Sequence, residues 1–419
     1  MISFAAPLPE MGDDLMAFVN ALCDRIEAVE PYIHALLPEE GRRARLLADA
    51  ARLLSTYPNA GVRPPLFGVP VGVKDLYHVA GFKTRAGSRL PPEPLTGAEG
   101  PVVRRLKDAG ALIIGKTVTT EFAYFSPGPT CNPHNITHTP GGSSSGSAAA
   151  VAAGECALAL GTQTIGSVSR PAAYCGVFGF KPSFGRMSVQ GVIPFSPRVD
   201  QMGYFAPDMA GILGAAPVMC DKWNTETPLP AVRPLVLGVP QGKYMAQADD
   251  TVLAFFKAQC ERLSDLGHKL IPCDPFPDIT RINAIHRTLN ALDLAKVHAA
   301  WFAKYEALYS PQTRALILEG QTADDTGADQ SIAGLRARMD GMMESLGLDL
   351  WLAPATTTPA PEGLSATGSP LMNLPFTHAG IPTLAVPAGK TTSGLPLGLQ
   401  LAGCFGRDED FLSLAASLA

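Results

Sequence analysis

The sequence predicts an α/β layered fold, in which strands and helices alternate along the chain and pack around a shared core. Short apolar runs typical of strands recur along its length, and helical patterns lie between them. Of the 419 residues, 46% are apolar and 17% are charged, which is typical of a globular chain with a substantial core. The 41 glycines and 38 prolines are spread throughout, so they indicate tight turns rather than a linker.

The first sixty residues are expected to be helical. Over residues 12–30, apolar side chains recur at helical spacing, and Pro31 is expected to end that helix. A second helix is expected over residues 40–55. We expect this N-terminal helical segment, residues 1–60, to pack on one larger domain, residues 61–419.

The strands of the larger domain are predicted from apolar runs bounded by turn-forming residues. Expected strands cover residues 67–73, 111–114, 158–160, 350–352, 383–386 and 397–401, and expected helices cover residues 100–109 and the Ala-rich stretch that ends near residue 153. Residues 235–273 have the pattern of a strand, a helix and a second strand. The rest of the region 220–345 carries few signals.

The charge balance restricts the classes of partner. There are 33 basic and 38 acidic residues, so the net charge is −5, and we expect neither a nucleic-acid partner nor binding to a membrane. No targeting or membrane-spanning segment is recognisable, and the eight cysteines form no CxxC pair. We therefore expect reduced thiols and a cytoplasmic location. No residue spacing suits a metal site convincingly, and we expect neither a metal nor a cofactor.

Residues 110–117, GALIIGKT, fit the phosphate-binding loop pattern but not its context. That loop needs a strand before its first glycine and a helix after its lysine. Here a helix is expected before Gly110, and the ALII spacer is itself a strand former. We therefore do not expect a nucleotide site.

Two further patterns are discounted because of their neighbours. Residues 142–146, GSSSG, match the nucleophile elbow of α/β-hydrolases, but turn formers precede them where that motif requires a strand. His134 and His138 have the spacing of metal ligands on a helix, but Pro133 and Pro140 disfavour a helix there. We expect the two histidines to be loop residues.

The residues that carry chemistry lie in a block rich in glycine and serine, residues 141–182. Two turns, GGSSSGS and GTQTIGS, flank one expected helix and one expected strand. Small residues let consecutive backbone N–H groups converge on one point, as an oxyanion site requires. A serine that ends such a turn is a natural nucleophile, but it needs a base.

Lys74 is the candidate base. It follows an apolar strand in PLFGVPVGVKDLY, and none of the eight histidines lies in a recognisable triad motif. A lysine at the end of a buried strand can lose its proton through desolvation and act as a base. The alternative is that Lys74 pairs with Asp75 or with another acid. These residues alone indicate an acyl-transfer site of the Ser–Lys type.

These segments resemble the amidase signature family. The resemblance covers most of the chain and includes GVPVGVKD, GAEGPVVRRLKDAGALIIGKTVTTEFA, the whole block 141–182 and NLPFTHAGIPTLAVPAGKTTSGLPLGLQLAG near the C-terminus. It implies a mixed β-sheet core sandwiched between α-helices and a Ser–cis-Ser–Lys triad. It also makes residues 61–419 a catalytic domain. The signature block most resembles that of malonamidase-type and carboxybiuret hydrolase-type members.

The resemblance assigns catalytic roles residue by residue. Ser167, the last serine of GTQTIGS, matches the nucleophile. Ser143 lies 24 residues earlier and matches the serine that the family holds through a cis peptide bond, here the bond from Gly142. Lys74 of GVKD matches the general base. Ser169, two residues after Ser167, does not match the nucleophile.

The resemblance also assigns an oxyanion hole. Backbone amides of Thr164, Ile165, Gly166 and Ser167 match its donors. Many members have two glycines before the nucleophile, whereas this chain has Ile165 and Gly166. We expect the isoleucine to make the pocket smaller without abolishing activity. Gln163 also replaces an aspartate that is more common in the family.

Arg170 is the candidate determinant of the substrate. It lies three residues after Ser167, where many relatives have an apolar residue. It resembles the arginine that holds a substrate carboxylate in malonamidase-type and carboxybiuret-type members, and a guanidinium can bind a carboxylate with two parallel hydrogen bonds. The alternative is a structural arginine paired with a buried acid such as Glu121 or Asp200. We expect Asp200 itself to support the site structurally.

The resemblance implies an amidohydrolase that cleaves a C–N bond of a small, carboxylate-bearing linear amide through an acyl-enzyme. Its expected partners are this small-molecule amide and, as the family default, a second copy of the chain. Two alternatives remain within the family: a general amidase for neutral amides and the A subunit of a tRNA-dependent amidotransferase. A non-catalytic scaffold is a further alternative, although the presence of all three triad residues argues against it.

Overall fold

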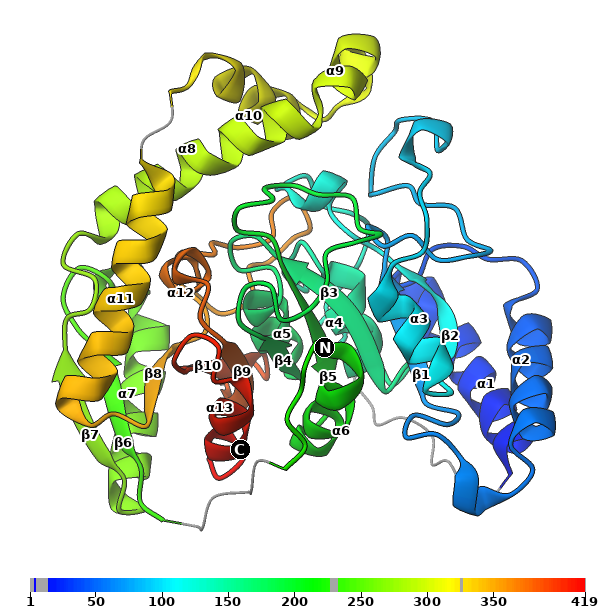
Figure 1. Cartoon of the computed structure of the whole chain (residues 1–419), viewed down its shortest axis with the longest axis horizontal. Coiled ribbons are helices and arrows are strands. Elements are labelled where there is room, and N and C mark those ends of the chain that lie inside the picture. The colour runs from blue at the N-terminus through cyan, green and yellow to red at the C-terminus, as the bar shows by residue number, and fades with distance from the viewer. Residues whose placement is uncertain (1–3, 5–13, 227–232, 325–326, 419) are drawn as a thin grey trace.

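The computed structural model describes residue 4 and residues 14–226, 233–324 and 327–418. Within these residues one ten-stranded sheet carries helices on both faces (Figure 1). The strands are β1 (Pro70–Lys74), β2 (Leu112–Thr117), β3 (Leu158–Gln163), β4 (Phe178–Lys181), β5 (Gln201–Ala206), β6 (Val236–Pro240), β7 (Lys269–Cys273), β8 (Leu350–Pro354), β9 (Thr383–Lys390) and β10 (Pro396–Ala402). The α-helices are α1 (Leu15–Ile33), α2 (Arg42–Thr56), α3 (Pro101–Asp108), α4 (Ser145–Ala152), α5 (Ser169–Cys175), α6 (Met209–Met219), α7 (Asp250–Asp265), α8 (Ile279–Val297), α9 (Ala299–Tyr305), α10 (Pro311–Thr322), α11 (Ala328–Leu346), α12 (Leu374–Ala379) and α13 (Asp408–Ala415).

The sheet is mixed, with strand order β2-β1-β3-β5-β4-β9-β10-β8-β6-β7. Strand β1 pairs in parallel with β2 and β3, and β6 pairs in parallel with β7 and β8. The central pairs, from β3–β5 through β10–β8, are antiparallel. Strands β1 and β3 are adjacent, so the segments that follow them lie close together. These are the segments that contain the candidate active site.

Successive strand residues face two different cores. Leu350 and Leu352 of β8 pack in one apolar cluster with helices α3, α6, α7 and α13. Trp351 and Ala353, between and after them, pack in another cluster with helices α11 and α12. Because successive side chains of a strand point to opposite faces, the sheet is covered by helices on both sides. The predicted fold, a mixed sheet sandwiched between helices, is confirmed.

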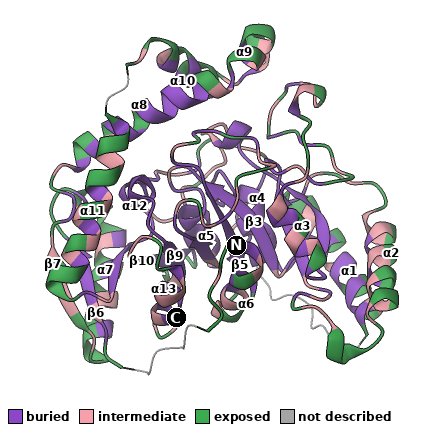
Figure 2. Ribbon diagram, viewed as in Figure 1, coloured by how far each residue is buried: buried purple, intermediate pink, exposed green. Residues whose placement is uncertain are grey.

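Helices α4 and α5, which follow the two serine-containing turns, are buried along their whole length (Figure 2). The sequence of α4, SGSAAAVA, has only small side chains, so neighbouring elements approach it from all sides. At Gly146 an added Cβ would lie 2.2 Å from the carbonyl oxygen of Ala35. The turns before these helices are therefore held by fully buried elements of the core.

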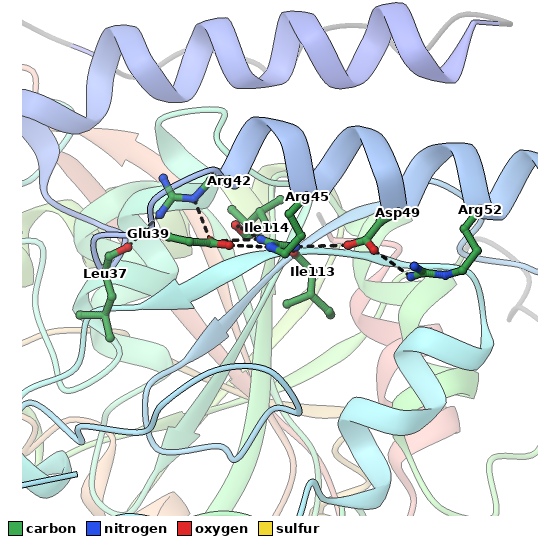
Figure 3. Close-up of polar contacts among 8 residues, drawn as sticks. All are labelled: Leu37, Glu39, Arg42, Arg45, Asp49, Arg52, Ile113 and Ile114. Atoms are coloured by element: carbon green, nitrogen blue, oxygen red, sulfur yellow. Dashed lines mark hydrogen bonds and ion pairs between the residues drawn. The ribbon is translucent and has the colours of Figure 1, made fainter.

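The N-terminal helices pack beside strand β2 (Figure 1). A polar network joins helix α2 to this strand: Arg45 donates to the carbonyl oxygens of Ile113 (2.8 Å) and Ile114 (3.2 Å) and pairs with Glu39 and Asp49 (Figure 3). The division into segment 1–60 and domain 61–419 stays a prediction, and it requires contacts of this kind between the two parts. Residues 1–3 and 5–13 of that segment lie outside the described residues.

Helix α1 continues past Pro31, contrary to the prediction, and ends at Ile33. Proline has no backbone N–H, so the helix continues through this position with one hydrogen bond fewer. His34 ends the helix in the left-handed region, with φ 53°. The carboxylate of Glu30 then accepts a hydrogen bond from the backbone N–H of Ala35 at 3.0 Å, which holds the chain as it leaves the helix.

The region with few sequence signals is largely helical. Helices α8 to α11 occupy most of residues 279–346, and α8 pairs with α10 at the top of the view in Figure 1. Both carry buried and exposed faces, so their apolar residues are mixed with polar ones along the sequence. Among the described helices, none is long and apolar enough to cross a membrane.

Two of the sequence patterns that we discounted, the phosphate-binding loop pattern and the histidine pair, have the local structure that their flanking residues predicted. Strand β2 runs through GALIIGKT, and Lys116 of that segment pairs with Asp75 at 2.7 Å in the interior. His134 and His138 lie in a loop, and His134 Nε2 lies 2.9 Å from the carbonyl oxygen of Cys175. All eight cysteines have free thiols.

Candidate active site

Lys74 ends strand β1 among three hydroxyl groups. Its Nζ lies 2.7 Å from Ser143 Oγ, 2.9 Å from Ser144 Oγ and 2.7 Å from Thr162 Oγ1. The side chain is completely buried. The alternative partner, Asp75, turns away and pairs with Lys116 instead. The sequence-predicted base and the sequence-predicted cis-serine are therefore in direct contact.

The environment of Lys74 favours the neutral amine. Burial holds the pKa of Lys74 well below its ordinary range, and the charge of Asp200 opposes this shift. Ser144 Oγ donates to the carbonyl oxygen of Thr162 at 3.3 Å, so it accepts from Lys74. A neutral amine can donate its two protons to Ser144 and Thr162 and direct its lone pair toward Ser143. In that state Lys74 can accept the proton of the Ser143 hydroxyl.

Ser143 is held by the backbone on both sides. The peptide bond from Gly142 to Ser143 is cis, as the resemblance implied. The carbonyl oxygen of Ser143 accepts a hydrogen bond from the backbone N–H of Thr120 at 3.2 Å. Gly141 has φ 83°, and an added Cβ would lie 2.9 Å from Pro171 Cα, so both its conformation and its surroundings require glycine.

Ser167 lies in the turn between strand β3 and helix α5. Gln163 holds this turn, because its Oε1 accepts from the backbone N–H of Val168 (2.7 Å) and of Ser169 (2.9 Å). Its Nε2 donates to Thr377 Oγ1 at 2.9 Å. An aspartate or glutamate could accept the first two bonds but, when ionised, could not donate the third. The glutamine therefore links the turn to helix α12.

The oxyanion loop, residues 164–167, has its carbonyl groups anchored. Three consecutive carbonyl oxygens accept hydrogen bonds from other groups: Thr164 from His286 Nε2 (2.9 Å), Ile165 from Thr377 Oγ1 (2.6 Å) and Gly166 from the backbone N–H of Arg170 (3.0 Å). The backbone N–H groups of Ile165, Gly166 and Ser167 have no acceptor within the described residues. Such fixed donors beside a serine are what stabilisation of an oxyanion requires.

Two buried histidines form a chain behind this loop. His286 of α8 and His378 of α12 approach through their Nδ1 atoms at 3.1 Å, and His378 Nε2 lies 2.9 Å from Ser331 Oγ. Since the carbonyl of Thr164 can only accept, His286 carries its proton on Nε2, and its Nδ1 accepts from His378. Burial lowers the pKa of His286 to about 3 and that of His378 to about 4, so both are neutral near pH 7.

Asp200 supports the same loop, as expected. Its carboxylate accepts from Thr164 Oγ1 at 2.5 Å and from the backbone N–H groups of Phe195 (2.8 Å) and Ser196 (3.0 Å). Burial raises the pKa of Asp200, and the hydrogen bond from Thr164 opposes that shift. Asp200 thus fixes the side chain of the first residue of the oxyanion loop.

Arg170 is buried without an acid partner among the described residues. Its Nη2 donates to the carbonyl oxygen of Gly142 at 2.6 Å and lies 3.3 Å from Thr367 Oγ1, while Nε and Nη1 have no hydrogen-bond partner within the described ranges. Burial lowers its pKa to about 10, so the guanidinium stays charged near pH 7. The two acids considered as structural partners bond elsewhere: Glu121 to Ser310, and Asp200 as described above.

A cavity of about 410 Å³ adjoins the oxyanion loop at Ile165. Its walls come from the loop that contains Tyr124 and Phe125, from helix α8, and from residues 369–374 before and within α12. The guanidinium carbon of Arg170 lies 5.9 Å from the centre of the Phe125 ring, which lines this cavity. Ile165 thus borders a cavity, although the sequence predicted only that it would reduce the space near the nucleophile.

Sequence reasoning missed the residues that anchor the site from outside the signature block. His286, Thr377 and His378 contact the oxyanion loop or each other, although 110 or more residues separate them from it. His378 and Thr377 lie in the recognised segment NLPFTHAGIP, and a buried polar pair in an apolar segment was the available signal. For His286 the sequence carries no such signal.

Comparison with known proteins identifies relatives of this chain. The family model described as Amidase matches residues 17–412. The A subunit of the glutamyl-tRNA(Gln) amidotransferase of Synechococcus sp. (strain WH7803) is 33% identical, covering 90% of this chain and 88% of that protein. Its counterpart in Roseiflexus castenholzii (strain DSM 13941 / HLO8) is 33% identical, covering 95% of this chain and 90% of that protein.

Solved structures agree with the fold. A crystal structure described as that of an amidase has 30% sequence identity and a TM-score of 0.87, covering 96% of this chain and 95% of that chain. A structure from a vestigial protein complex, described as revealing the evolutionary origins of an s-triazine catabolic enzyme, has 27% identity and a TM-score of 0.85. That match covers 96% of this chain and 94% of the other.

These relatives correct one prediction and leave another without support. The prediction that no nucleic acid is a partner is wrong, since several relatives are subunits of an amidotransferase named for glutamyl-tRNA(Gln). Net charge failed here because it averages over the whole surface and does not describe any one face. The particular resemblance to malonamidase-type and carboxybiuret hydrolase-type members is not shown by these relatives. The family itself is shown: this chain belongs to the amidase family.

Proposed function

We propose that the chain is an amidohydrolase that releases ammonia or an amine from a small, carboxylate-bearing amide through a Ser167 acyl-enzyme. The contact between Lys74 Nζ and Ser143 Oγ, 2.7 Å long and buried, is the observation that carries the proposal. A buried neutral amine beside a serine hydroxyl is a base in position to start acyl transfer.

The proposed reaction follows from these positions. Ser167 Oγ attacks the amide carbon as its proton passes to Ser143 Oγ, whose own proton passes to Lys74 Nζ. The backbone N–H groups of residues 164–167 stabilise the oxyanion. The C–N bond then breaks, and the leaving nitrogen takes the proton back through Ser143. Water attacks the ester carbon of the acyl-enzyme and loses its proton by the same route, which frees Ser167 and the acid product.

Arg170 is proposed to bind the carboxylate of the substrate. Two of its buried nitrogens, Nε and Nη1, have no partner in the described part of the chain, and it is linked to the cis-serine turn through Gly142. A carboxylate placed there would pair with the guanidinium and satisfy those donors.

A second candidate is supported by the relatives rather than by the geometry. Amidotransferase subunits with about a third of residues identical span nine tenths of the chain. Glutamine is itself an amide that bears a carboxylate, so the first half of the proposed reaction would be shared. The nitrogen would then pass, with other subunits present, to glutamyl-tRNA(Gln) instead of being released.

The test is ammonia release from malonamate, malonamide and glutamine by the purified chain. Ser167→Ala should lower the rate by at least about 10⁴-fold. Ser169→Ala, which removes the buried hydroxyl two residues on, is the matched control and should retain activity. Unchanged hydrolysis by Ser167→Ala would refute the assignment of the nucleophile.

Two comparisons separate the candidates. A preference for malonamate over malonamide that Arg170→Met reduces by about 10–100-fold supports the carboxylate-binding role. Glutamine hydrolysis that is weak alone and rises when partner subunits and glutamyl-tRNA(Gln) are added supports the amidotransferase. A preference for malonamide would make the chain an amidase for neutral amides.

A further inference from the structure

The cavity beside Ile165 has apolar walls that the proposed reaction does not use. Phe125, Ile165, Leu316, Leu371 and Leu374 contribute to its lining. Its volume of about 410 Å³ lies in the range of small-molecule sites. A carboxylate-bearing amide as small as malonamate would leave most of this space unfilled.

One face of helix α8 adds polar groups to this wall. Asn283, His286 and Asn290 lie three and four residues apart and line the same cavity. His286 is bonded through both ring nitrogens, to Thr164 and to His378. Asn283 donates to Gln247, and its oxygen has no partner in the part of the chain that the structure describes. These two side chains therefore have a place in the protein's own hydrogen-bond network.

Asn290 differs from both. It is 2% exposed, and neither its Oδ1 nor its Nδ2 has a hydrogen-bond partner among the described residues. A buried amide that makes no hydrogen bond destabilises the protein, and native proteins rarely leave both of its atoms without a partner. Since it borders a cavity, a ligand can supply those bonds. Its amide offers a donor and an acceptor side by side.

We propose that the amide substrate carries an apolar substituent that enters this cavity and ends in a carboxamide-like group bound by Asn290. This inference rests on the proposed function and names the substrate class. The reacting amide lies at Ser167, and Ile165, which belongs to the oxyanion loop, also borders the cavity. One ligand can therefore occupy both places. A terminal carboxylate or ammonium fits less well, because each leaves one of the two amide atoms without a complement.

The first experiment measures binding, independently of turnover. Calorimetry on Ser167→Ala protein compares malonamate, 2-benzylmalonamate and 2-(4-carbamoylbenzyl)malonamate. The benzyl group should tighten binding by about 10-fold or more through burial of apolar surface. The carbamoyl group should tighten it by about a further 5-fold through the hydrogen bonds to Asn290. Equal affinity for malonamate and the benzyl compound would overturn the proposal.

Variants then identify the site of binding. Asn290→Leu, in the same background, should remove the gain from the carbamoyl group while the gain from the benzyl group persists. Ala284→Trp, at an exposed position on the rim of the cavity, should remove both gains. The matched control is Asn20→Leu on the exposed face of α1, which should bind all three ligands like the parent protein. Equal losses for all three ligands in Asn290→Leu would assign Asn290 a structural role and refute its part in binding.

Ammonia release by the wild-type chain distinguishes failure of this inference from failure of the proposed function. Tighter binding of the substituted ligands without any ammonia release would refute the hydrolytic function and leave the substituent pocket standing. Ammonia release at equal kcat/KM from all three amides would refute the pocket and leave the hydrolytic function standing.

Discussion

The buried histidine chain behind the oxyanion loop should make the protein sensitive to acid. His286 and His378 have pKa values lowered by burial to about 3 and about 4, whereas an unfolded histidine titrates near 6.5. Between those values the unfolded state binds more protons than the folded state. The contribution of the two histidines to the free energy of unfolding is therefore fully present above pH 6.5 and is lost as the pH falls toward 4.

The size of the effect follows from these pKa values. From pH 7 to pH 5, one histidine that stays neutral in the folded state lowers the free energy of unfolding by about 2 kcal/mol. Protonation of the pair would also place two N–H groups against each other at the 3.1 Å contact between the Nδ1 atoms. Near pH 3, where His286 also becomes protonated, this repulsion should separate the two rings, and the oxyanion loop should lose one of its anchors.

The assay is urea denaturation at pH 7, 6 and 5, with the free energy of unfolding compared between wild type and His286→Gln. The variant should be less stable at pH 7, but its stability should fall by about 2 kcal/mol less between pH 7 and pH 5. His34→Gln, which removes an exposed imidazole, is the matched control for the substitution itself. An equal pH dependence in wild type and His286→Gln would refute the assignment of a buried neutral pair.

Three further predictions concern the site and its support. Lys74→Met removes the proposed base, so it should lower the rate of ammonia release by at least about 10³-fold in steady-state kinetics. The circular dichroism spectrum should stay that of the wild type. Activity within 10-fold of wild type would exclude that role. Gly166→Ala places a Cβ 2.5 Å from Asn373 Oδ1, so kcat and the melting temperature should both fall, and a normal kcat would contradict the required close approach. Arg45→Met removes the hydrogen bonds from helix α2 to two carbonyl groups of β2. It should lower the free energy of unfolding, measured by urea titration, by about 1–3 kcal/mol and leave kcat unchanged. A stability equal to that of the wild type would contradict this prediction.

The sequence by itself determined the fold class and the positions of the site-forming turns. Apolar runs that alternate with helical patterns predict a sheet covered by helices, because strands buried on both faces are continuously apolar. The turns at 141–147 and 161–167 were recognisable because they need several glycines and serines close together in sequence. Lys74 was recognisable as a lone basic residue at the end of an apolar strand.

Only the tertiary structure decided what surrounds these turns. The pairing of β1 with β3 brings Lys74 to Thr162, and parallel strands of this kind leave no sequence signal for their neighbour. His286 supports the oxyanion loop across 122 residues of chain, and Asn290 borders the cavity without a hydrogen-bond partner among the residues described. Helical periodicity identifies the face of α8 that is buried, but hydrogen bonds and cavities depend on which elements meet that face. Those contacts depend on packing between segments that are distant in sequence, so only the folded structure reveals them.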